Sequence, residues 1–148
     1  MRLDLLLRWL GSPAATPHAG LYAGYIWDGS EGRRTKPLRD PYAKSYMPED
    51  QWPHDSYPPF ASGCGFLIAY DLIEALVAAS PSFTFFRVID VPIGVCLDRL
   101  APDYLPDGRL RIVHMPEVSG TLIASDCFRV LPSASDCFRV LLIASECF

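Results

Sequence analysis

Apolar residues recur at helical or strand spacing in short stretches near the start of the chain. Leucines at i, i+3, i+4 and i+7 within residues 3–10 predict an amphipathic helix, which Gly11-Ser12-Pro13 ends. The compact aromatic run at residues 21–27 precedes an Asp28-Gly29 turn signal and predicts a buried strand.

Two transitions from strand to helix follow further along. Residues 66–69 predict a strand, and Asp71 begins a helix whose apolar side chains share one face. Residues 85–89 predict a strand that leads into a second helix, which begins at Asp90. The alternating residues 110–113 predict one more strand. This order of elements indicates an α/β fold.

Residues 28–60, between the predicted strands at 21–27 and 66–69, show neither helical nor strand spacing of apolar residues. Their repeated prolines exclude both a long helix and a central strand. A structureless stretch of this length is uncommon in a compact domain unless it is functional or disordered. Its aromatic and charged side chains suit a carbohydrate, whose C–H faces pack on rings and whose hydroxyls bind carboxylates and Arg. The same composition also fits a proline-rich surface loop pinned by its own aromatic residues. These side chains are Tyr42, Tyr46, Trp52, Tyr57 and Phe60, with Arg39, Lys44, Asp50 and Asp55.

The end of the chain is a short exact repeat. Residues 125–131 recur unchanged as residues 135–141, and a third copy begins at Ser145, which gives a period of ten. Solenoid repeats are longer, about 20 to 50 residues, and their copies differ at surface positions. We therefore expect residues 1–118 to form the domain. Residues 119–148 are interpreted as an irregular or disordered tail, the product of a translated nucleotide repeat or a gene-model artefact.

Composition and charge narrow the partners of the chain. Of its 148 residues 50% are hydrophobic and 20% charged, which excludes wholesale disorder. The net charge of −4 comes without a basic run, so nucleic acid is not an expected partner. No stretch approaches the roughly 18 apolar residues that span a bilayer, so we expect no membrane segment or secretory signal in this chain. Five cysteines without a CxxC pair indicate neither a zinc site nor a complete disulfide framework.

A few residues outside the loop could carry chemistry. Gly63 and Gly65 would let a ligand approach the backbone closely, or they mark a bulge at the entry to a strand. Asp90 is placed either to cap its helix or to act as a general base toward a sugar hydroxyl. His114 could ligate a metal, although a histidine without other ligands in view is more often structural.

Blocks of the sequence occur in a specific order: Pro37-Leu38-Arg39-Asp40, Lys44-Ser45-Tyr46, residues 57–66 and residues 89–97. They resemble the patterns P-V-R-D, K-W-Y, Y-P-P-Y-x-S-G-x-G-Y and E-D-V-Y-V-G-x-C-L of glycosyltransferase family 31, the β-1,3-galactosyltransferase-like hexosyltransferases. Any one block alone is weak, and their shared order makes the resemblance specific. It covers the C-terminal portion of that family's domain.

The resemblance implies the C-terminal half of a GT-A fold, an inverting reaction, a UDP-sugar donor and a glycan acceptor. It implies Mn²⁺ held by an Asp-x-Asp motif and, for a full-length member, a Golgi membrane location. Asp90 matches the carboxylate that deprotonates the acceptor, and His114, in a stretch similar to the family's V-H-x-x-x-P-E, is the candidate metal ligand. The residues that would line the substrate cleft are Arg39, Lys44, Tyr46, Trp52, Tyr57, Pro59, Phe60, Ser62, Gly63 and Gly65.

The sequence also departs from the family pattern. Ile89 replaces the Glu of the E-D pair, Ser45 replaces the Trp of K-W-Y, and no Asp-x-Asp lies anywhere in the chain. We therefore expect the donor-binding half and a membrane anchor to lie upstream of Met1, and we expect no measurable transfer by this chain because the main Mn²⁺ ligands are absent. Two alternatives remain: a non-catalytic carbohydrate- or protein-binding remnant, and a gene-model product without function.

Overall fold

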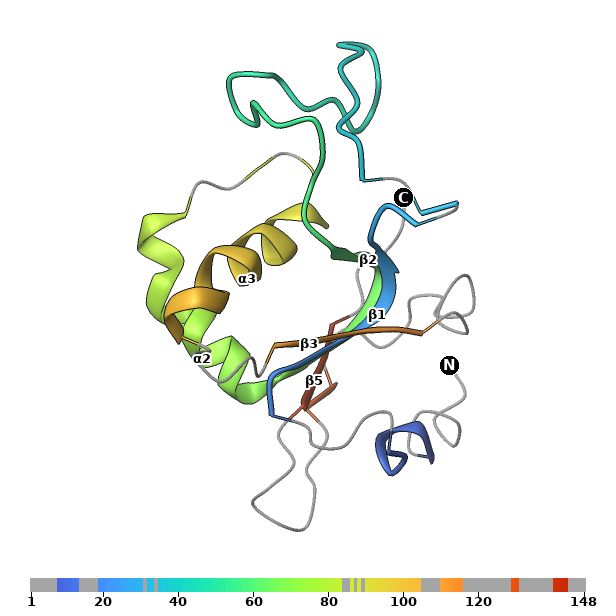
Figure 1. Cartoon of the computed structure of the whole chain (residues 1–148), viewed down its shortest axis with the longest axis vertical. Helices are drawn as coiled ribbons and strands as arrows, with labels where there is room; N and C mark the ends of the chain where they lie inside the picture. The colour runs from blue at the N-terminus through green and yellow to red at the C-terminus, as the bar shows by residue number, and fades with distance from the viewer. Residues whose placement is uncertain are drawn as a thin grey trace.

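The described part of the chain is a five-stranded sheet with its two longer helices on one side (Figure 1). The structure is a computed structural model that describes residues 8–13, 19–30, 32–33, 35–83, 86, 88, 90–104, 110–115, 129–130 and 140–143. In chain order the elements are β1 (Leu21–Trp27), β2 (Phe60–Ala69), α2 (Tyr70–Ala79), the 3₁₀-helix η1 (Ser80–Ser82), α3 (Val91–Tyr104), β3 (Arg111–His114), β4 (Arg129–Val130) and β5 (Val140–Ile143). The strand order is β3-β1-β2-β5-β4. Residues 35–59 extend beyond the ends of the strands as a long loop (Figure 1).

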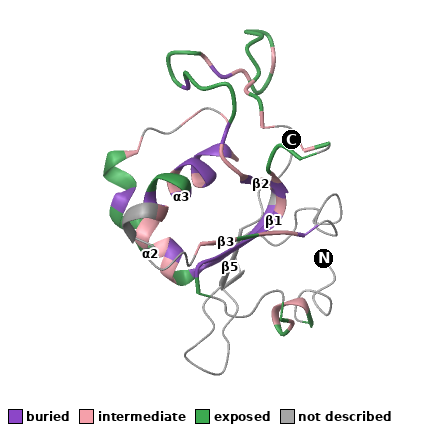
Figure 2. Cartoon of the chain, viewed as in Figure 1, coloured by how far each residue is buried: buried purple, intermediate pink, exposed green. Residues whose placement is uncertain are grey.

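β1 is an interior strand that organises the main hydrophobic core. It pairs antiparallel with β2 and parallel with β3, and its first four residues are buried without alternation. Such a run is typical of a strand covered on both faces. Leu72 of α2 and Leu97 of α3 belong to the same core, and Trp9 packs against it. Figure 2 shows the buried residues concentrated in the strands and in α3, whereas the long loop is largely exposed.

A carboxylate ties α2 to the start of β1. Asp71 accepts the Gly20 N–H with both oxygens, at 2.9 and 3.2 Å. The helix itself begins one residue earlier, at Tyr70, and no side chain caps it. Asp71 therefore fixes the position of α2 against the sheet instead of starting the helix.

In the ranges that the structure describes, no helix is long and apolar enough to cross a membrane.

Most of the predicted elements are confirmed, and the α/β class with them. The strand at residues 21–27 is β1, the predicted second helix is α3, and the strand at 110–113 is shifted by one residue to become β3. The strand at 66–69 is only the second half of β2. Residues 8–10 of the first predicted helix are helical, and the rest of that helix lies outside the described residues. Within 85–89 the structure describes only Phe86 and Val88, and neither lies in a strand.

The repeat tail differs from the expectation in two segments. β5 pairs antiparallel with β2, with Ile68 opposite Leu141, and β4 pairs with β5 in turn. The edge of β2 would otherwise present unpaired backbone groups, and the Val-Leu-Leu-Ile sequence of β5 suits a strand. An irregular tail is therefore wrong for these residues, and the other residues from 119 to 148 lie outside the described part of the chain.

Candidate functional site

Asp90 lies directly before the first residue of α3, with its side chain half-buried. A capping role would show as a hydrogen bond from an α3 amide to the carboxylate, and no such bond is present among the described residues. The amide end of a helix nevertheless attracts an anion. The carboxylate thus lies at the amide end of α3 without a hydrogen bond to another described residue.

The long loop has a small hydrophobic core of its own, which we call the loop core. It joins buried side chains of the loop to the start of β2 and to the first turns of α3; its members are Met47, Trp52, Tyr57, Phe60, Val91 and Val95. The ring centroids of Trp52 and Tyr57 are 5.6 Å apart, and those of Tyr57 and Phe60 are 5.9 Å apart. The loop is therefore docked on the end of α3 that carries Asp90.

Three of the aromatic side chains that were predicted to bind a sugar are buried in the loop core. Trp52 is 6% exposed, and Tyr57 and Phe60 are each 8% exposed. This packing agrees with the interpretation of the segment as a loop pinned by its own aromatic residues. Contact of these residues with a substrate stays a prediction.

Arg39 holds the loop together from within. Its guanidinium donates to the carbonyl oxygens of Met47 at 2.8 Å, Trp52 at 2.7 Å and His54 at 3.1 Å. The Tyr57 N–H donates to the Thr35 carbonyl at 2.8 Å, which joins the two ends of the loop. Arg39 was predicted to line a substrate cleft, and the structure shows its guanidinium bound to three carbonyls of the loop backbone.

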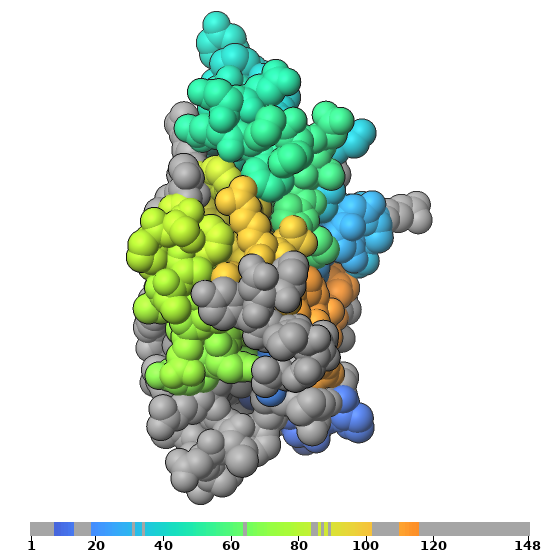
Figure 3. Space-filling view, turned by 60° about the vertical axis from the view of Figure 1, so that its left-hand side comes forward, coloured from blue at the N-terminus to red at the C-terminus, as the bar shows by residue number. Residues whose placement is uncertain are grey.

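Two other predicted loop residues lie at its outer turns: Lys44 is exposed and Tyr46 is half-buried. Pro59, also half-buried, directly precedes β2. Leu38 and Tyr46 form an isolated parallel bridge that closes the tip of the loop. Figure 3 shows the loop forming one end of the molecule, above α3. Lys44 and Tyr46 are therefore on the surface, where a ligand could reach them.

The two glycines in the block at residues 57–66, Gly63 and Gly65, lie in a bulge of β2. Gly24 of β1 pairs with Phe66, and Ile26 pairs with Ala61, so residues 62–65 of β2 face a single residue of β1. Gly65 has a φ of 152°, which L side chains rarely adopt. The bulge interpretation of Gly63 and Gly65 is confirmed by this register, and Ser62 lies in the same bulge, half-buried.

Gly94 is a positioning residue that the sequence alone did not single out. A Cβ built on it would lie 2.5 Å from the Pro59 carbonyl oxygen and 2.6 Å from the Phe60 Cβ. The helix can thus approach the start of β2 only because residue 94 has no side chain. A glycine in the middle of a helix lowers helix stability by about 1 kcal/mol relative to alanine. A glycine within the predicted helix could therefore have indicated a close contact with another element.

His114 at the end of β3 supports the sheet. Its Nδ1 accepts the Ile26 N–H at 3.1 Å, and its ring meets that of Tyr25 with centroids 4.9 Å apart. With Nδ1 accepting this hydrogen bond, the neutral imidazole carries its proton on Nε2. No group of three or more potential metal-ligating side chains occurs in the part of the chain that the structure describes. These residues by themselves do not fit a divalent cation, and the metal role of His114 stays a prediction.

Tyr22, a buried residue of β1, interacts electrostatically with Asp90. Its phenol oxygen accepts the Ala61 N–H at 2.9 Å, and the residue is fully buried. Burial raises the pKa of Tyr22 well above its usual range, and the negative charge of Asp90 raises it further. The charge of the Asp90 carboxylate therefore affects a side chain in the hydrophobic core.

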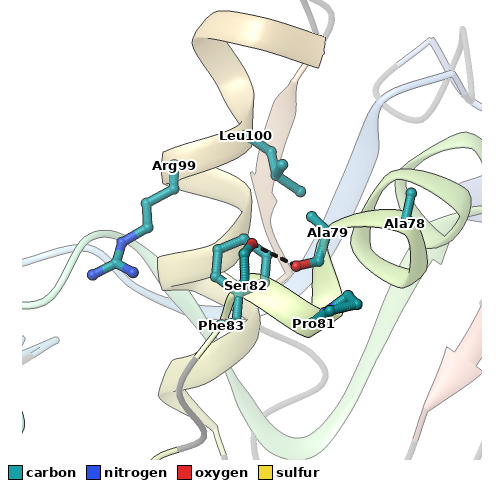
Figure 4. A pocket seen from close by; sticks show the side chains of 7 residues that line it. All are labelled: Ala78, Ala79, Pro81, Ser82, Phe83, Arg99 and Leu100. Atoms are coloured by element: carbon teal, nitrogen blue, oxygen red, sulfur yellow. Dashed lines mark hydrogen bonds between the residues drawn. The ribbon is translucent and has the colours of Figure 1, made fainter.

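A pocket of about 430 Å³ lies between the end of α2 and the second half of α3 (Figure 4). It is lined by the end of α2, by η1 with Phe83, and by Arg99 and Leu100 of α3. The Ser82 hydroxyl donates to the Ala79 carbonyl at 2.7 Å beside it. None of the residues predicted for the site contributes to its lining, so this pocket is separate from the surface around Asp90.

Comparison with known proteins agrees with the order of the sequence blocks. A galactosyltransferase family model matches residues 2–104. Beta-1,3-galactosyltransferase 1 of Mus musculus and its Homo sapiens counterpart are each 33% identical over 100 residues, which cover 68% of this chain and 29% of the relative. Beta-1,3-galactosyltransferase 2 of Homo sapiens is 32% identical over 103 residues, which cover 70% of this chain and 23% of the relative. The chain thus spans less than a third of the length of these curated relatives.

Proposed function

Because the chain belongs to the galactosyltransferase family, we propose that it is the acceptor-side, C-terminal part of an inverting β-1,3-hexosyltransferase domain. The donor is a UDP-sugar and the acceptor is a glycan or a glycoprotein. On this proposal the sheet and α3 are half of a GT-A fold, and a full-length protein of this kind works in the Golgi.

The position of Asp90 carries the proposal. Its carboxylate is half-buried at the start of α3, has no hydrogen bond to another described residue and is held in place by the loop core. It takes the proton of an acceptor hydroxyl. The freed oxygen bonds to the anomeric carbon from the face opposite the diphosphate, and the bond from that carbon to the UDP oxygen breaks, so UDP leaves with the electron pair.

We propose further that the chain does not complete this reaction alone. A divalent metal neutralises a diphosphate leaving group. The sequence has no Asp-x-Asp, and the described residues do not provide a metal site. The chain's own residues are then confined to positioning and deprotonating the acceptor.

Transfer assays with two proteins test this function. The 148-residue chain with UDP-galactose, Mn²⁺ and an N-acetylglucosamine acceptor should give no turnover. A fusion that supplies the N-terminal part of mouse beta-1,3-galactosyltransferase 1 should give turnover, and Asp90→Asn should lower kcat by about 10²–10⁴-fold. Asp98→Asn, an exposed change on the same helix, should leave the rate unchanged. Turnover by the chain alone refutes the claim of inactivity, and a fusion whose rate is unchanged by Asp90→Asn refutes the role of Asp90 as the base.

The second candidate function is a non-catalytic carbohydrate-binding remnant. The observation that favours it is the loop core, which shapes the loop entirely from residues of this chain. Glycan binding by a fusion that never turns over UDP-galactose would support this candidate over the enzyme.

A further inference from the structure

The second half of β2 has the sequence of an interior strand. Its residues 66–69 are all apolar, and none of them is more than 6% exposed. A buried run without alternation is typical of a strand covered on both faces. These residues include no proline, no charged side chain and no bulge, which are the features that keep an edge strand from pairing with other chains. This half of β2 therefore needs a partner strand at each edge.

The two partners of β2 differ in origin. β1 pairs with one edge, and both β1 and β2 lie within residues 2–104, which match the galactosyltransferase family model. β5 pairs with the other edge, with Ile68 opposite Leu141, and lies outside that match. Val140 and Leu141 also belong to the second copy of the exact repeat. A segment of the repeat tail thus covers the edge of a strand that the family shares.

The opposite end of the sheet has the features of an edge. β3 is four residues long, none of its side chains is fully buried, and Ile112 is 38% exposed. Short and partly exposed strands are common at sheet edges. Without β5 and β4 the sheet would end instead at the apolar residues 66–69 of β2. If further strands of a larger domain join this sheet, β2 is therefore the better place for them than β3.

β5 is held in the sheet over a short length. It pairs with β2 at four positions and with β4 at two. A two-stranded hairpin by itself is at best marginally stable, so β4 adds little support. If another strand takes the same edge, the backbone hydrogen bonds of β2 are exchanged and not lost, which leaves no buried group unpaired. A longer strand can therefore replace β5.

We propose that β5 occupies the edge of β2 at which a strand from the donor-binding part of a galactosyltransferase domain pairs, and that this strand displaces β5 when the two parts join. The inference rests on the proposed function, in which the chain is one part of such a domain. The partner is an extended apolar segment that adds to the sheet through main-chain hydrogen bonds. In the free chain, β5 keeps the same edge from pairing with other molecules.

Amide hydrogen exchange tests the displacement in two proteins. They are the free 148-residue chain and its fusion with the N-terminal part of mouse beta-1,3-galactosyltransferase 1. In the free chain the amides of β5 and of residues 66–69 should both be protected. In the fusion residues 66–69 should stay protected, whereas the β5 amides should exchange about a hundredfold faster. The inference is overturned by β5 amides that are unprotected in the free chain, by β5 amides that stay protected in the fusion, or by residues 66–69 that lose protection together with β5.

A substitution in β5 tests its covering role separately. Leu141→Pro removes an N–H and disfavours the strand, whereas the matched control Leu141→Val keeps a strand-forming residue. In the free chain, Leu141→Pro should speed exchange of those amides of residues 66–69 that point toward β5 about tenfold or more. In the fusion, the same amides should regain wild-type protection, and Leu141→Val should behave as the wild type in both proteins. Protection that Leu141→Pro leaves unchanged in the free chain overturns the covering role of β5.

Turnover of UDP-galactose by the fusion separates this inference from the proposed function. Release of β5 with residues 66–69 still protected, but without turnover, supports the strand exchange and counts against the proposed enzyme. Turnover by a fusion whose β5 amides stay protected supports the enzyme and overturns the strand exchange.

Discussion

Gly94 is the position where a single methyl group should disturb the candidate site most. In Gly94→Ala the new Cβ would lie 2.5 Å from the Pro59 carbonyl oxygen, whereas ordinary contacts begin at 3.4 Å, so α3 must move by about 0.9 Å. The other close atoms are Cβ and Cα of Phe60, at 2.6 and 3.0 Å, and neither can swing aside as a flexible side-chain end can. Overpacking of this kind costs about 1–3 kcal/mol.

Helix propensity acts in the opposite direction at this position. Alanine is preferred over glycine in a helix interior by about 1 kcal/mol. Because the clash involves backbone atoms, we place it at the upper end of its range and expect a net loss of about 1–2 kcal/mol in the free energy of unfolding. For a chain of this size that corresponds to a fall of roughly 2–8 °C in Tm.

Urea unfolding and thermal melts of the 148-residue chain measure this loss. The control is Ala78→Gly, an exposed position in the last turn of α2, where a loss of no more than about 1 kcal/mol is expected. Replacing glycine with alanine at 94 and alanine with glycine at 78 should therefore both destabilise the chain. A Gly94→Ala protein that is as stable as the wild type, or more stable, would refute the close approach of α3 to β2.

Two further changes probe the loop and the sheet. Arg39→Ala removes three hydrogen bonds to loop carbonyls and should lower the stability of the loop by about 1–3 kcal/mol. Limited proteolysis should then cut residues 35–59 faster than in the wild type. Lys44→Ala, at an exposed position, should leave the cleavage rate unchanged. Burial raises the pKa of Tyr22, so above about pH 10 the unfolded chain loses a proton that the folded chain keeps. The free energy of unfolding should therefore fall as pH rises, by up to about 1.4 kcal/mol per pH unit. Urea midpoints between pH 9 and 11 measure this slope. Tyr22→Phe should make the slope less steep, and an unchanged slope would contradict the burial argument.

Local sequence predicted the elements whose residues are themselves strand or helix formers. The aromatic run of β1 and the apolar face of α3 are examples, because burial on one or both sides is visible in their own spacing. The first half of β2 was missed because it is rich in small residues and contains Gly63 and Gly65, which have low strand propensity. Its pairing is imposed by β1, and such a partner cannot be read from the strand alone.

The loop core was the harder feature to predict from the sequence. Its rings recur at no regular period, so the segment reads as a loop, and the partners of Trp52 and Tyr57 include Val91, far away in the chain. Composition left open whether these rings serve a ligand or the fold. The structure shows them packed, and among the described residues the Tyr57 hydroxyl is the only buried side-chain polar group without a hydrogen-bond partner.

The geometry around Asp90 depends on contacts within the loop and between the loop and α3. Arg39 shapes the loop, Tyr57 and Phe60 dock it on α3, and Gly94 sets how closely α3 approaches β2. Each of these contacts fixes the start of the helix, and the carboxylate is attached to that start. A displacement of about 1 Å in a catalytic group is enough to lower a rate by about a hundredfold. Changes at Gly94 should therefore lower kcat in the active fusion by more than the loss of folded protein explains, whereas changes at the distant pocket beside Arg99 should not.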